Sequence, residues 1–237
     1  MSALSQEPCT DCLVKNRALC RVLDAGALAA FSQSGRRRFL VPGESLAWQG
    51  DADAPCATVI SGAVKLSSVD AEGEERIVGL ALPADFVGLP FEAQASLQAT
   101  ALVRSELCIF PRDAFVAALD ENRELERELL RRTMGELVDA RASDLRSASR
   151  SARERVASLL VQLHGRGASG CAADIDPDRL ELPLSRGEIA QLLDVRIETV
   201  SREIVALEED SLLKREGRSG IRILDAAGLC VAAGMDG

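Results

Sequence analysis

The sequence between residues 184 and 207 constrains the fold more than any other stretch, because it reads as two short helices joined by a tight turn. Ser185 stands three residues before Glu188, the capping-box spacing in which each side chain satisfies the other residue's backbone amide. Apolar residues then recur at helical spacing until residues 194–196 interrupt them, and a second amphipathic helix is expected to begin near Ile197. The pattern predicts a helix-turn-helix, and a helical hairpin inside an ordinary core is the alternative.

The second helix of this pair is expected to bury one apolar side and to turn polar side chains outward. Arg202 can bond guanine through two nitrogens, Glu198 can accept a hydrogen bond from cytosine, and Ser201 can contact a base edge or a phosphate. Arg186, at the N-terminus of the first helix, is suited to a phosphate contact. The predicted DNA-binding residues are therefore Glu198, Thr199, Ser201, Arg202, Ser185 and Arg186.

The motif S-R-G-E-I-A-x-x-L-x-V-x-x-E-T-V-S-R at residues 185–202 resembles the helix-turn-helix of the CRP/FNR superfamily of bacterial transcription regulators. Its E-T-V-S-R segment is closer to the FNR branch than to the cyclic-AMP branch. The resemblance implies a homodimer on double-stranded DNA with a palindromic operator and TTGAT-type half-sites. It also implies an α+β fold with an N-terminal antiparallel β-roll similar to cyclic-nucleotide-binding domains, a long dimerisation helix and a C-terminal winged helix-turn-helix.

The bulk composition excludes some classes of protein. The 237 residues contain no run of 18 apolar residues and no export signal, so we expect a cytoplasmic protein without a membrane span. A net charge of −9 argues against a non-specific nucleic-acid coat protein, but a specific binder depends on local charge instead. Seven cysteines in such a chain point to metal or redox chemistry before structural disulfides.

Three of these cysteines, Cys9, Cys12 and Cys20, form a C-x2-C-x7-C pattern in a short polar segment. Two thiolates separated by two residues can converge on one metal or cluster edge, and a third can close over it. Three ligands are too few for a closed site, so a fourth must come from elsewhere in the chain. The candidates are Cys56, Cys108, Cys171, Cys230 and His164. Incidental cysteines or a reversible disulfide are the alternatives to ligation.

FNR-like oxygen sensors carry an N-terminal trio of this kind and a fourth cysteine in the last strand of the sensor domain, just before a proline. The matching residue here is Cys108 in SELCIFPRDAF. The resemblance therefore implies that a [4Fe–4S] cluster is held by Cys9, Cys12, Cys20 and Cys108. Cys56, Cys171 and Cys230 match no family ligand, and we expect them to be small hydrophobic residues, commonly buried.

Residues 36–111 read as short strands separated by turns, which suggests a small antiparallel roll with Trp48 in its core. The strands expected are Ala57–Ile60, Ala63–Val69, Glu75–Leu82, Leu97–Leu102 and Ser105–Pro111. Nucleotide-binding members of the family grip the cyclic phosphate with an arginine. Here Gln98 and Ala99 occupy the matching positions and Pro90 lies in the cradle, so no cyclic-nucleotide site is predicted.

The AEGEE sequence at residues 71–75 is an acidic hairpin tip, for which a solvated turn is the default interpretation. In the FNR family the equivalent hairpin touches RNA polymerase. The resemblance therefore suggests a polymerase contact through Glu72 or Glu74.

A short helix from Pro111 to Leu119 and a long one from Glu121 to about Ser147 are expected next. Along the long helix, residues that would face a partner recur about every 3.5 positions, which is the period of a seam between two helices. Its apolar first half and polar second half make the seam weak, because Asp139 and Asp144 would repel their copies across a symmetry axis. The predicted dimer switch consists of Leu130, Leu137, Asp139, Ala140 and Asp144. A solvated helix flank with ordinary surface acids is the alternative.

Residues 165–179 read as a linker, followed by a short strand, the helix-turn-helix and a β-hairpin wing. The wing carries cations suited to phosphate contacts, namely Lys214, Arg215, Arg218 and Arg222. The expected divisions are a cysteine-rich segment at 1–24, the roll at 25–119, the dimerisation helix at 120–148 and the DNA-binding domain at 149–237.

The sequence thus predicts an oxygen-responsive transcription regulator and not an enzyme. A regulator of the same family that senses redox or reactive species through disulfide or zinc chemistry is the runner-up. An enzyme with a ferredoxin-like cluster is disfavoured, because no catalytic constellation is present.

Overall fold

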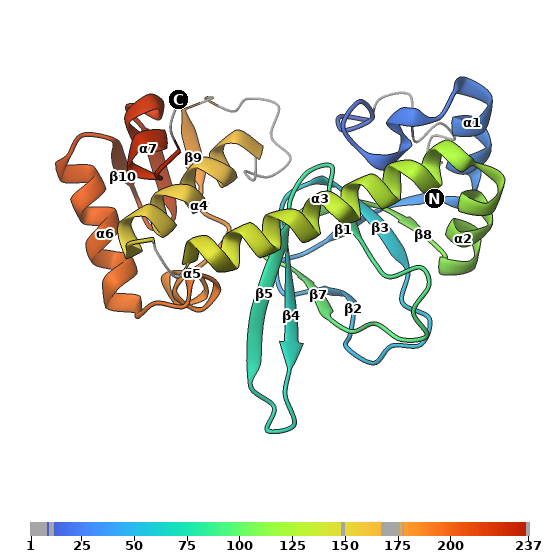
Figure 1. Cartoon of the computed structure of the whole chain (residues 1–237), viewed down its shortest axis with the longest axis horizontal. Helices are drawn as coiled ribbons and strands as arrows, with labels where there is room; N and C mark the ends of the chain where they lie inside the picture. The colour runs from blue at the N-terminus through green and yellow to red at the C-terminus, as the bar shows by residue number, and fades with distance from the viewer. Residues whose placement is uncertain (1–8, 10–11, 148–149, 167–175, 177, 236–237) are drawn as a thin grey trace.

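The computed structural model describes residues 9, 12–147, 150–166, 176 and 178–235, with residues 139 and 142–147 described as backbone only. A β-roll with its N-terminal helices lies at one end of the molecule and a helical domain with a small sheet lies at the other. The long helix α3 (Arg123–Ser147) runs from one to the other (Figure 1). This is the α+β architecture that the sequence predicts.

The roll consists of two four-stranded antiparallel sheets, with strand orders β1-β8-β3-β6 and β2-β7-β4-β5. Apolar side chains of both sheets, such as Leu40, Val59 and Leu107, meet in one buried core. The strands are β1 (Arg36–Leu40), β2 (Ser45–Ala47), β3 (Cys56–Ser61), β4 (Val64–Val69), β5 (Glu75–Ala81), β6 (Phe86–Val87), β7 (Gln98–Ala101) and β8 (Ser105–Phe110). The five predicted strands are confirmed as β3, β4, β5, β7 and β8.

The prediction that Trp48 lies in the core is wrong, because its side chain is 59% exposed. Strand β2 ends at Ala47, and Trp48 already belongs to the turn, where its backbone N–H donates to the Asp51 carboxylate at 2.8 Å. The buried Leu46 and Ala47 fill the interior position at this end of β2 instead.

Two N-terminal helices pack against the roll near Phe110, the last residue of β8. They are the 3-10 helix η1 (Leu19–Val22) and α1 (Ala25–Ser34), which Asp24 caps by accepting a hydrogen bond from the Ala27 N–H at 2.8 Å. Phe31 of α1 stacks on Phe110 of β8, with ring centroids 4.3 Å apart. These contacts tie the N-terminal segment to the last strand of the roll.

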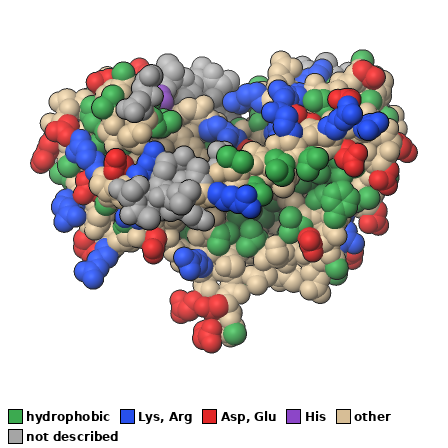
Figure 2. Space-filling model, viewed as in Figure 1, with side chains coloured by type: hydrophobic (Ala, Val, Ile, Leu, Met, Phe, Trp, Pro, Cys, Tyr) green, Lys and Arg blue, Asp and Glu red, His purple; other side chains and the backbone are tan. Residues whose placement is uncertain are grey.

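The predicted pair of helices after the roll is confirmed as α2 (Arg112–Glu121) and α3. Leu125, near the start of α3, is fully buried against Leu19 of η1, but the helix then leaves apolar side chains exposed. Leu130, Met134 and Leu137 are 62%, 52% and 41% exposed. Hydrophobic side chains gather on the face of the molecule that α3 crosses (Figure 2).

The predicted switch residues fall on this helix with different outcomes. Leu130 and Leu137 are exposed apolar residues, as a seam awaiting a partner requires, and Ala140 is exposed as well. The side chains of Asp139 and Asp144 lie outside the described part of the structure. Repulsion between these acids therefore stays a prediction.

In the described part of the C-terminal domain, four helices pack around a three-stranded sheet with the order β10-β11-β9. Its elements are α4 (Ala152–Arg166), β9 (Arg179–Glu181), α5 (Arg186–Leu193), α6 (Ile197–Glu209), β10 (Leu213–Glu216), β11 (Gly220–Ile223) and α7 (Ala226–Ala232). The predicted short strand, helix pair and wing are confirmed, whereas α4 and α7 were not expected. Of the predicted linker, residues 165–166 belong to α4, and residues 167–175 and 177 lie outside the described residues.

The core of this domain continues into the roll, because Ala63 and Leu82 belong to the same buried cluster as Leu160 and Ile204. Polar contacts accompany it. Gln191 of α5 donates to the Glu75 carbonyl of β5 at 2.5 Å, and Arg166 of α4 pairs with Asp85. Among the described residues, no helix is both long and apolar enough to cross a membrane.

Candidate cysteine site and DNA-binding surface

The four cysteines predicted as ligands come from two parts of the chain and lie near enough to interact electrostatically. Cys9, Cys12 and Cys20 belong to the N-terminal segment, whereas Cys108 lies on β8. Cys12, Cys20 and Cys108 pack against one small apolar cluster formed by Val14, Ala18, Ile60 and Ala84. The fold therefore brings together sulfurs that are up to 99 positions apart in sequence.

The thiols affect one another's titration. Burial raises the pKa of Cys20 to about 11, and the negative charges that Cys12 and Cys9 would carry add to the shift. Burial raises the pKa of Cys108 to about 12, with Cys9, Cys12 and Cys20 adding in the same direction. Neighbouring thiolates destabilise one another, so Cys20 and Cys108 stay protonated near neutral pH unless a cation binds them.

Cations surround the thiols and act in the opposite direction. Arg37 of β1 stands directly opposite Cys108 in the β1–β8 register, and side chains of such cross-strand pairs share one face of the sheet. Burial raises the pKa of Cys9, and the charges of Arg37 and Lys15 offset part of that rise. Arg37 and Arg132 likewise offset part of the rise in pKa at Cys108 and at Cys20. These side chains would offset the negative charge of a thiolate-bound cofactor.

The described cysteines are all free thiols. In the described part of the chain, no three His, Cys, Asp or Glu side chains stand close enough together to hold a single metal ion. Cys56 is fully buried in the roll, which confirms its predicted role as a small core residue. Cys230 is partly buried on α7, and Cys171 lies outside the described residues.

The helix-turn-helix is built by two local devices that its sequence encodes. The predicted capping box is present, with the Ser185 hydroxyl accepting from the Glu188 N–H at 3.2 Å and the Glu188 carboxylate accepting from the Ser185 N–H at 2.8 Å. Helix α5 ends at Asp194, whose left-handed conformation (φ 51°, ψ 53°) reverses the chain toward α6. Val200, Ile204 and Leu207 of α6 are buried beneath the surface it presents.

The outer face of α6 carries the predicted reading residues. Glu198, Ser201 and Arg202 are exposed, and Thr199 is half-buried beside them. The Arg202 side chain is 73% exposed and lies 3.6 Å from the Glu203 carboxylate, so it can leave this loose pair to reach a base. The prediction of a polar outer face is confirmed, and which base each residue contacts stays a prediction.

The two predicted DNA-binding residues at the start of α5 differ. Ser185 is exposed, but its hydroxyl also donates to the Glu188 carboxylate at 2.8 Å and is fully used by the cap. Arg186 is half-buried, with its Nη1 atom buried and without a hydrogen-bond partner. Burial, followed by the charge of Arg215, lowers the pKa of Arg186. The phosphate contact of Arg186 therefore stays a prediction.

The wing cations divide into two kinds. Lys214 and Arg218 are exposed on the hairpin. Arg215 is bound to Glu208 at 2.6 Å, and Arg222 is bound to Glu216 at 2.7 Å and to Asp176. Arg215 and Arg222 must break these ion pairs before they can bind a phosphate of the DNA.

Comparison with known proteins assigns each half of the chain to a known type of domain. Residues 37–122 match the cyclic nucleotide-binding domain, and residues 154–232 match the Crp-like helix-turn-helix domain. The chain is 34% identical to the transcriptional activator protein FnrL of Cereibacter sphaeroides, over 96% of this chain and 92% of that protein. The chain belongs to the CRP/FNR family of transcription regulators. Its helix-turn-helix is therefore a DNA-binding unit.

Other members of the CRP/FNR family agree with this placement. The transcriptional activator protein FnrA of Stutzerimonas stutzeri is 34% identical over 98% of this chain and 95% of its own length. Among solved structures, FixK2 from Bradyrhizobium japonicum superimposes with a TM-score of 0.71 at 25% identity, covering 84% of this chain and 96% of that one.

The roll shares the cyclic-nucleotide-binding fold of the family, and Gln98, at a position expected to contact the phosphate in nucleotide-binding members, bonds within the roll. Gln98 of β7 donates its amide to the Thr100 hydroxyl at 3.0 Å and to Ser45. Arg112 of α2 donates to the Glu92 carbonyl at 2.8 Å and to those of Ala52 and Ala93. These hydrogen bonds tie the start of α2 to the two loops that contain the acceptors. The absence of a nucleotide site stays a prediction.

Proposed function

We propose that this chain is an oxygen-responsive transcriptional activator whose DNA binding depends on a [4Fe–4S] cluster held by Cys9, Cys12, Cys20 and Cys108. The observation that carries the proposal is the approach of the three N-terminal cysteines to partly buried Cys108 on β8, where Arg37, Lys15 and Arg132 act on the thiols. Cysteine thiolates are the ligands that such clusters use. The FNR-type relatives support the same interpretation.

The residues around the cysteines suit an anionic cofactor. Arg37, Lys15 and Arg132 counter the charge of four thiolates, which would otherwise repel one another. The apolar side chains of Val14 and Ile60 limit access of water to the sulfurs. When bound, the cluster would supply sensitivity to oxygen, and its loss would return the cysteines to neutral thiols.

The exposed stripe of Leu130, Met134 and Leu137 supports a homodimer formed through α3. Two copies of α6 would then face successive half-sites of one operator, as the symmetry of such regulators requires. Glu198, Ser201 and Arg202 are suited to reading a TTGAT-type half-site, because it offers a G·C pair between A·T pairs.

We also assign a polymerase contact to the tip of the β4–β5 hairpin, which projects from the roll (Figure 1). Glu72 and Glu74 are exposed there, with their N–H groups held by the Asp70 carboxylate at 3.0 and 2.9 Å. Reversing both charges should lower activation and leave operator binding intact. Unchanged activation by the reversed protein would remove this assignment.

The test of the sensor is purification of the full chain without oxygen, followed by its visible spectrum and iron and sulfide analysis before and after air. We expect about four iron and four sulfide per chain, with loss of both and of operator binding in air. Cys108→Ser should lose iron, whereas Cys230→Ser is the matched control and should keep it.

Other outcomes point elsewhere. Bound zinc, or a disulfide without iron, would favour the alternative regulator that senses redox or reactive species. Protein free of iron after strict anoxia, or Cys108→Ser with unaltered operator binding in both atmospheres, would contradict the proposal.

A further inference from the structure

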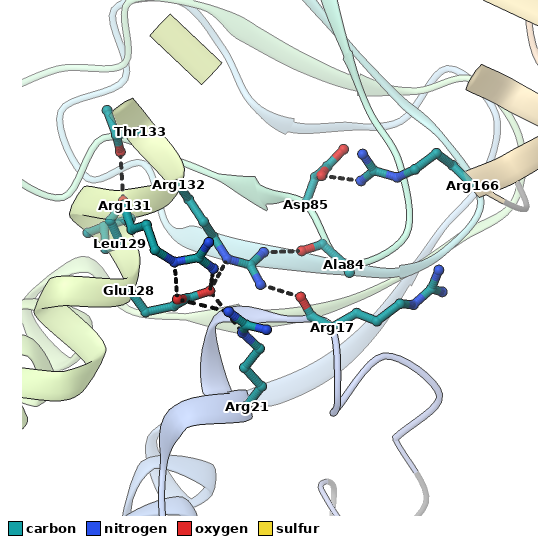
Figure 3. Close-up of polar contacts among 10 residues, drawn as sticks. All are labelled: Arg17, Arg21, Ala84, Asp85, Glu128, Leu129, Arg131, Arg132, Thr133 and Arg166. Atoms are coloured by element: carbon teal, nitrogen blue, oxygen red, sulfur yellow. Dashed lines mark hydrogen bonds and ion pairs between the residues drawn. The ribbon is translucent and has the colours of Figure 1, made fainter. Parts of the chain in front are cut away.

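A carboxylate and three arginines form a junction between the cysteine segment and α3 (Figure 3). The Glu128 side chain is only 4% exposed, and it accepts from Arg21 at 3.0 Å, Arg131 at 2.8 Å and Arg132 at 2.8 Å. Burial alone would raise the pKa of Glu128, but the hydrogen bonds from Arg21, Arg132 and Arg131 outweigh it and hold the pKa at about 2. Glu128 is therefore ionised at any physiological pH.

The members of this junction come from distant parts of the chain. Arg131 and Arg132 lie on α3 itself, within one turn of Glu128, whereas Arg21 lies on η1 directly after Cys20. Arg132 reaches further and donates to the carbonyl of Arg17, between Cys12 and Cys20 in sequence. It also donates to the Ala84 carbonyl of the roll at 3.1 Å. Arg132 of α3 is thus hydrogen-bonded both to the cysteine segment and to the roll.

The chain also offers an ordinary ion pair on the same helix for comparison. Glu124 and Arg127 pair at 2.9 Å with side chains 64% and 59% exposed, so solvent screens them and they stabilise little. Glu128 bears the desolvation cost that this surface pair avoids. Buried charges hold one geometry, since an unpaired carboxylate in that place is strongly unfavourable.

The junction lies between the cysteine segment and the exposed apolar stripe of α3 that we propose forms the dimer. On one side, Arg21 adjoins Cys20, and the Ala84 side chain belongs to the cluster on which the thiols pack. On the other side, the exposed dimerisation stripe begins at Leu130, two residues after Glu128. A rigid helix transmits a displacement at Glu128 to this stripe within its first turns.

We propose that Glu128 is a positioning residue that, with Arg21 and Arg132, makes the placement of α3 depend on the state of the cysteine segment. The inference rests on the proposed cluster for its signal, but the anchoring itself is a property of the chain without any cofactor. Loss of the junction should leave the fold intact and weaken the link between the cysteines and dimerisation.

The first test measures amide hydrogen exchange in the full-length protein without iron. Arg21→Gln removes only the end on the cysteine segment, and Glu128 keeps two arginines, so the variant should fold. Exchange at residues 19–23 should become about tenfold faster, because local opening is no longer opposed by the ion pair. Arg127→Gln, the matched change in the exposed pair, should leave it unchanged. Alkylation of the buried Cys56 monitors global unfolding.

The second test compares dimer dissociation constants of the cluster-bound and cluster-free protein by sedimentation. The ratio of the two constants should fall at least about tenfold in Arg21→Gln and in Glu128→Gln, and the double variant should show little further loss. Unaltered exchange in Arg21→Gln, or a ratio equal to that of Arg127→Gln, would overturn the inference. If the wild-type protein contains no iron, only the proposed function is contradicted. The exchange measurement still tests whether the junction holds the cysteine segment, because it uses protein without iron.

Discussion

On the recognition helix, exposure separates single residues that can reach DNA from those that hold the helix in place. Arg202 extends into solvent, whereas Val200 and Ile204 on the opposite side are within 1% of complete burial. Arginine presents paired donors that match the O6 and N7 atoms of guanine, which no other base pair offers in the major groove. Arg202 is therefore the residue from which most of the sequence discrimination should come.

Arg202→Ala should weaken binding to a TTGAT-type operator by about 1–3 kcal/mol in each half-site. The loss should be smallest on operators in which the G·C pair is already replaced, because the contact is absent there. Electrophoretic mobility shifts with both operators measure the difference, and Glu209→Ala at the exposed far end of α6 is the control. Equal losses on both operators would show that Arg202 contacts phosphate instead.

The raised thiol pKa values predict slow alkylation of the iron-free protein. With the pKa of Cys20 near 11 instead of the ordinary 9.0, the reactive thiolate is about 100-fold scarcer at pH 8 than in an unfolded chain. Labelling with iodoacetamide, followed by mass spectrometry, should show rates for Cys20 and Cys108 that climb with pH beyond 9. Because the folded pKa values exceed the unfolded ones, the stabilisation from these thiols is complete below pH 9 and is lost as pH rises. Labelling as fast as in urea would contradict this.

At the residue scale, sequence reasoning reached what depends on local pattern. The cysteine spacing and the Ser185–Glu188 cap are local, and both were predicted. The approach of Cys108 to the trio came only from family resemblance, since no spacing rule joins a strand to a segment so far away. The Arg21–Glu128 pair was not predicted, because its residues are 107 positions apart and neither has a distinctive neighbour pattern.

At the scale of elements, the wing hairpin illustrates how internal pairing limits what a cation can do. Arg218 lies exposed at the tip, whereas Arg222 on β11 is held by Glu216 at 2.7 Å and by Asp176. A paired arginine must break its own contacts before it can bind phosphate, and an exposed one need not. The two residues should therefore differ in their effect on DNA binding.

Arg218→Gln should weaken binding to all operator sequences alike and reduce the salt dependence of the binding constant, by about 0.9 in the log–log slope for each phosphate that is no longer neutralised. Arg222→Gln should lower the thermal stability of the wing and change that slope little. Fluorescence anisotropy over a range of salt concentrations measures both. An equal decrease of the slope in both variants would show that the acidic partners release Arg222 on DNA.

Elements were predictable where one period dominates the sequence. The pairs α5–α6 and β10–β11 have clear periodicity and turn signals, and so do α2 and α3. Strand β1 was missed because its three arginines give it an exposed face, and its pairing with β8 is what makes it a strand. Helix α4 was also missed, although its buried Val156, Leu160 and Leu163 recur at helical spacing between the arginines.

At the scale of the whole molecule, one apolar cluster joins the roll to the DNA-binding domain. Leu82, directly after β5, is fully buried in the same cluster as Ile189 of α5 and Leu163 of α4. The next turn carries Ala84, which receives Arg132, and Asp85, which receives Arg166 of α4. The segment that lies beside the cysteines therefore also contacts the domain that reads DNA, and no sequence period revealed this shared core.

If the shared core couples the two domains, two leucine truncations of equal size should act differently. Leu107 is buried wholly within the roll, so Leu107→Ala should cost about 2–5 kcal/mol and leave the domains unfolding together. Leu82→Ala removes the same volume from the joint cluster, so exchange of α4–α6 amides should become faster at urea concentrations at which the strands of the roll stay protected. Hydrogen exchange across a urea series separates the two peptide by peptide. Coincident transitions in Leu82→Ala would mean that α3 or the polar contacts, and not the apolar cluster, make the molecule cooperative.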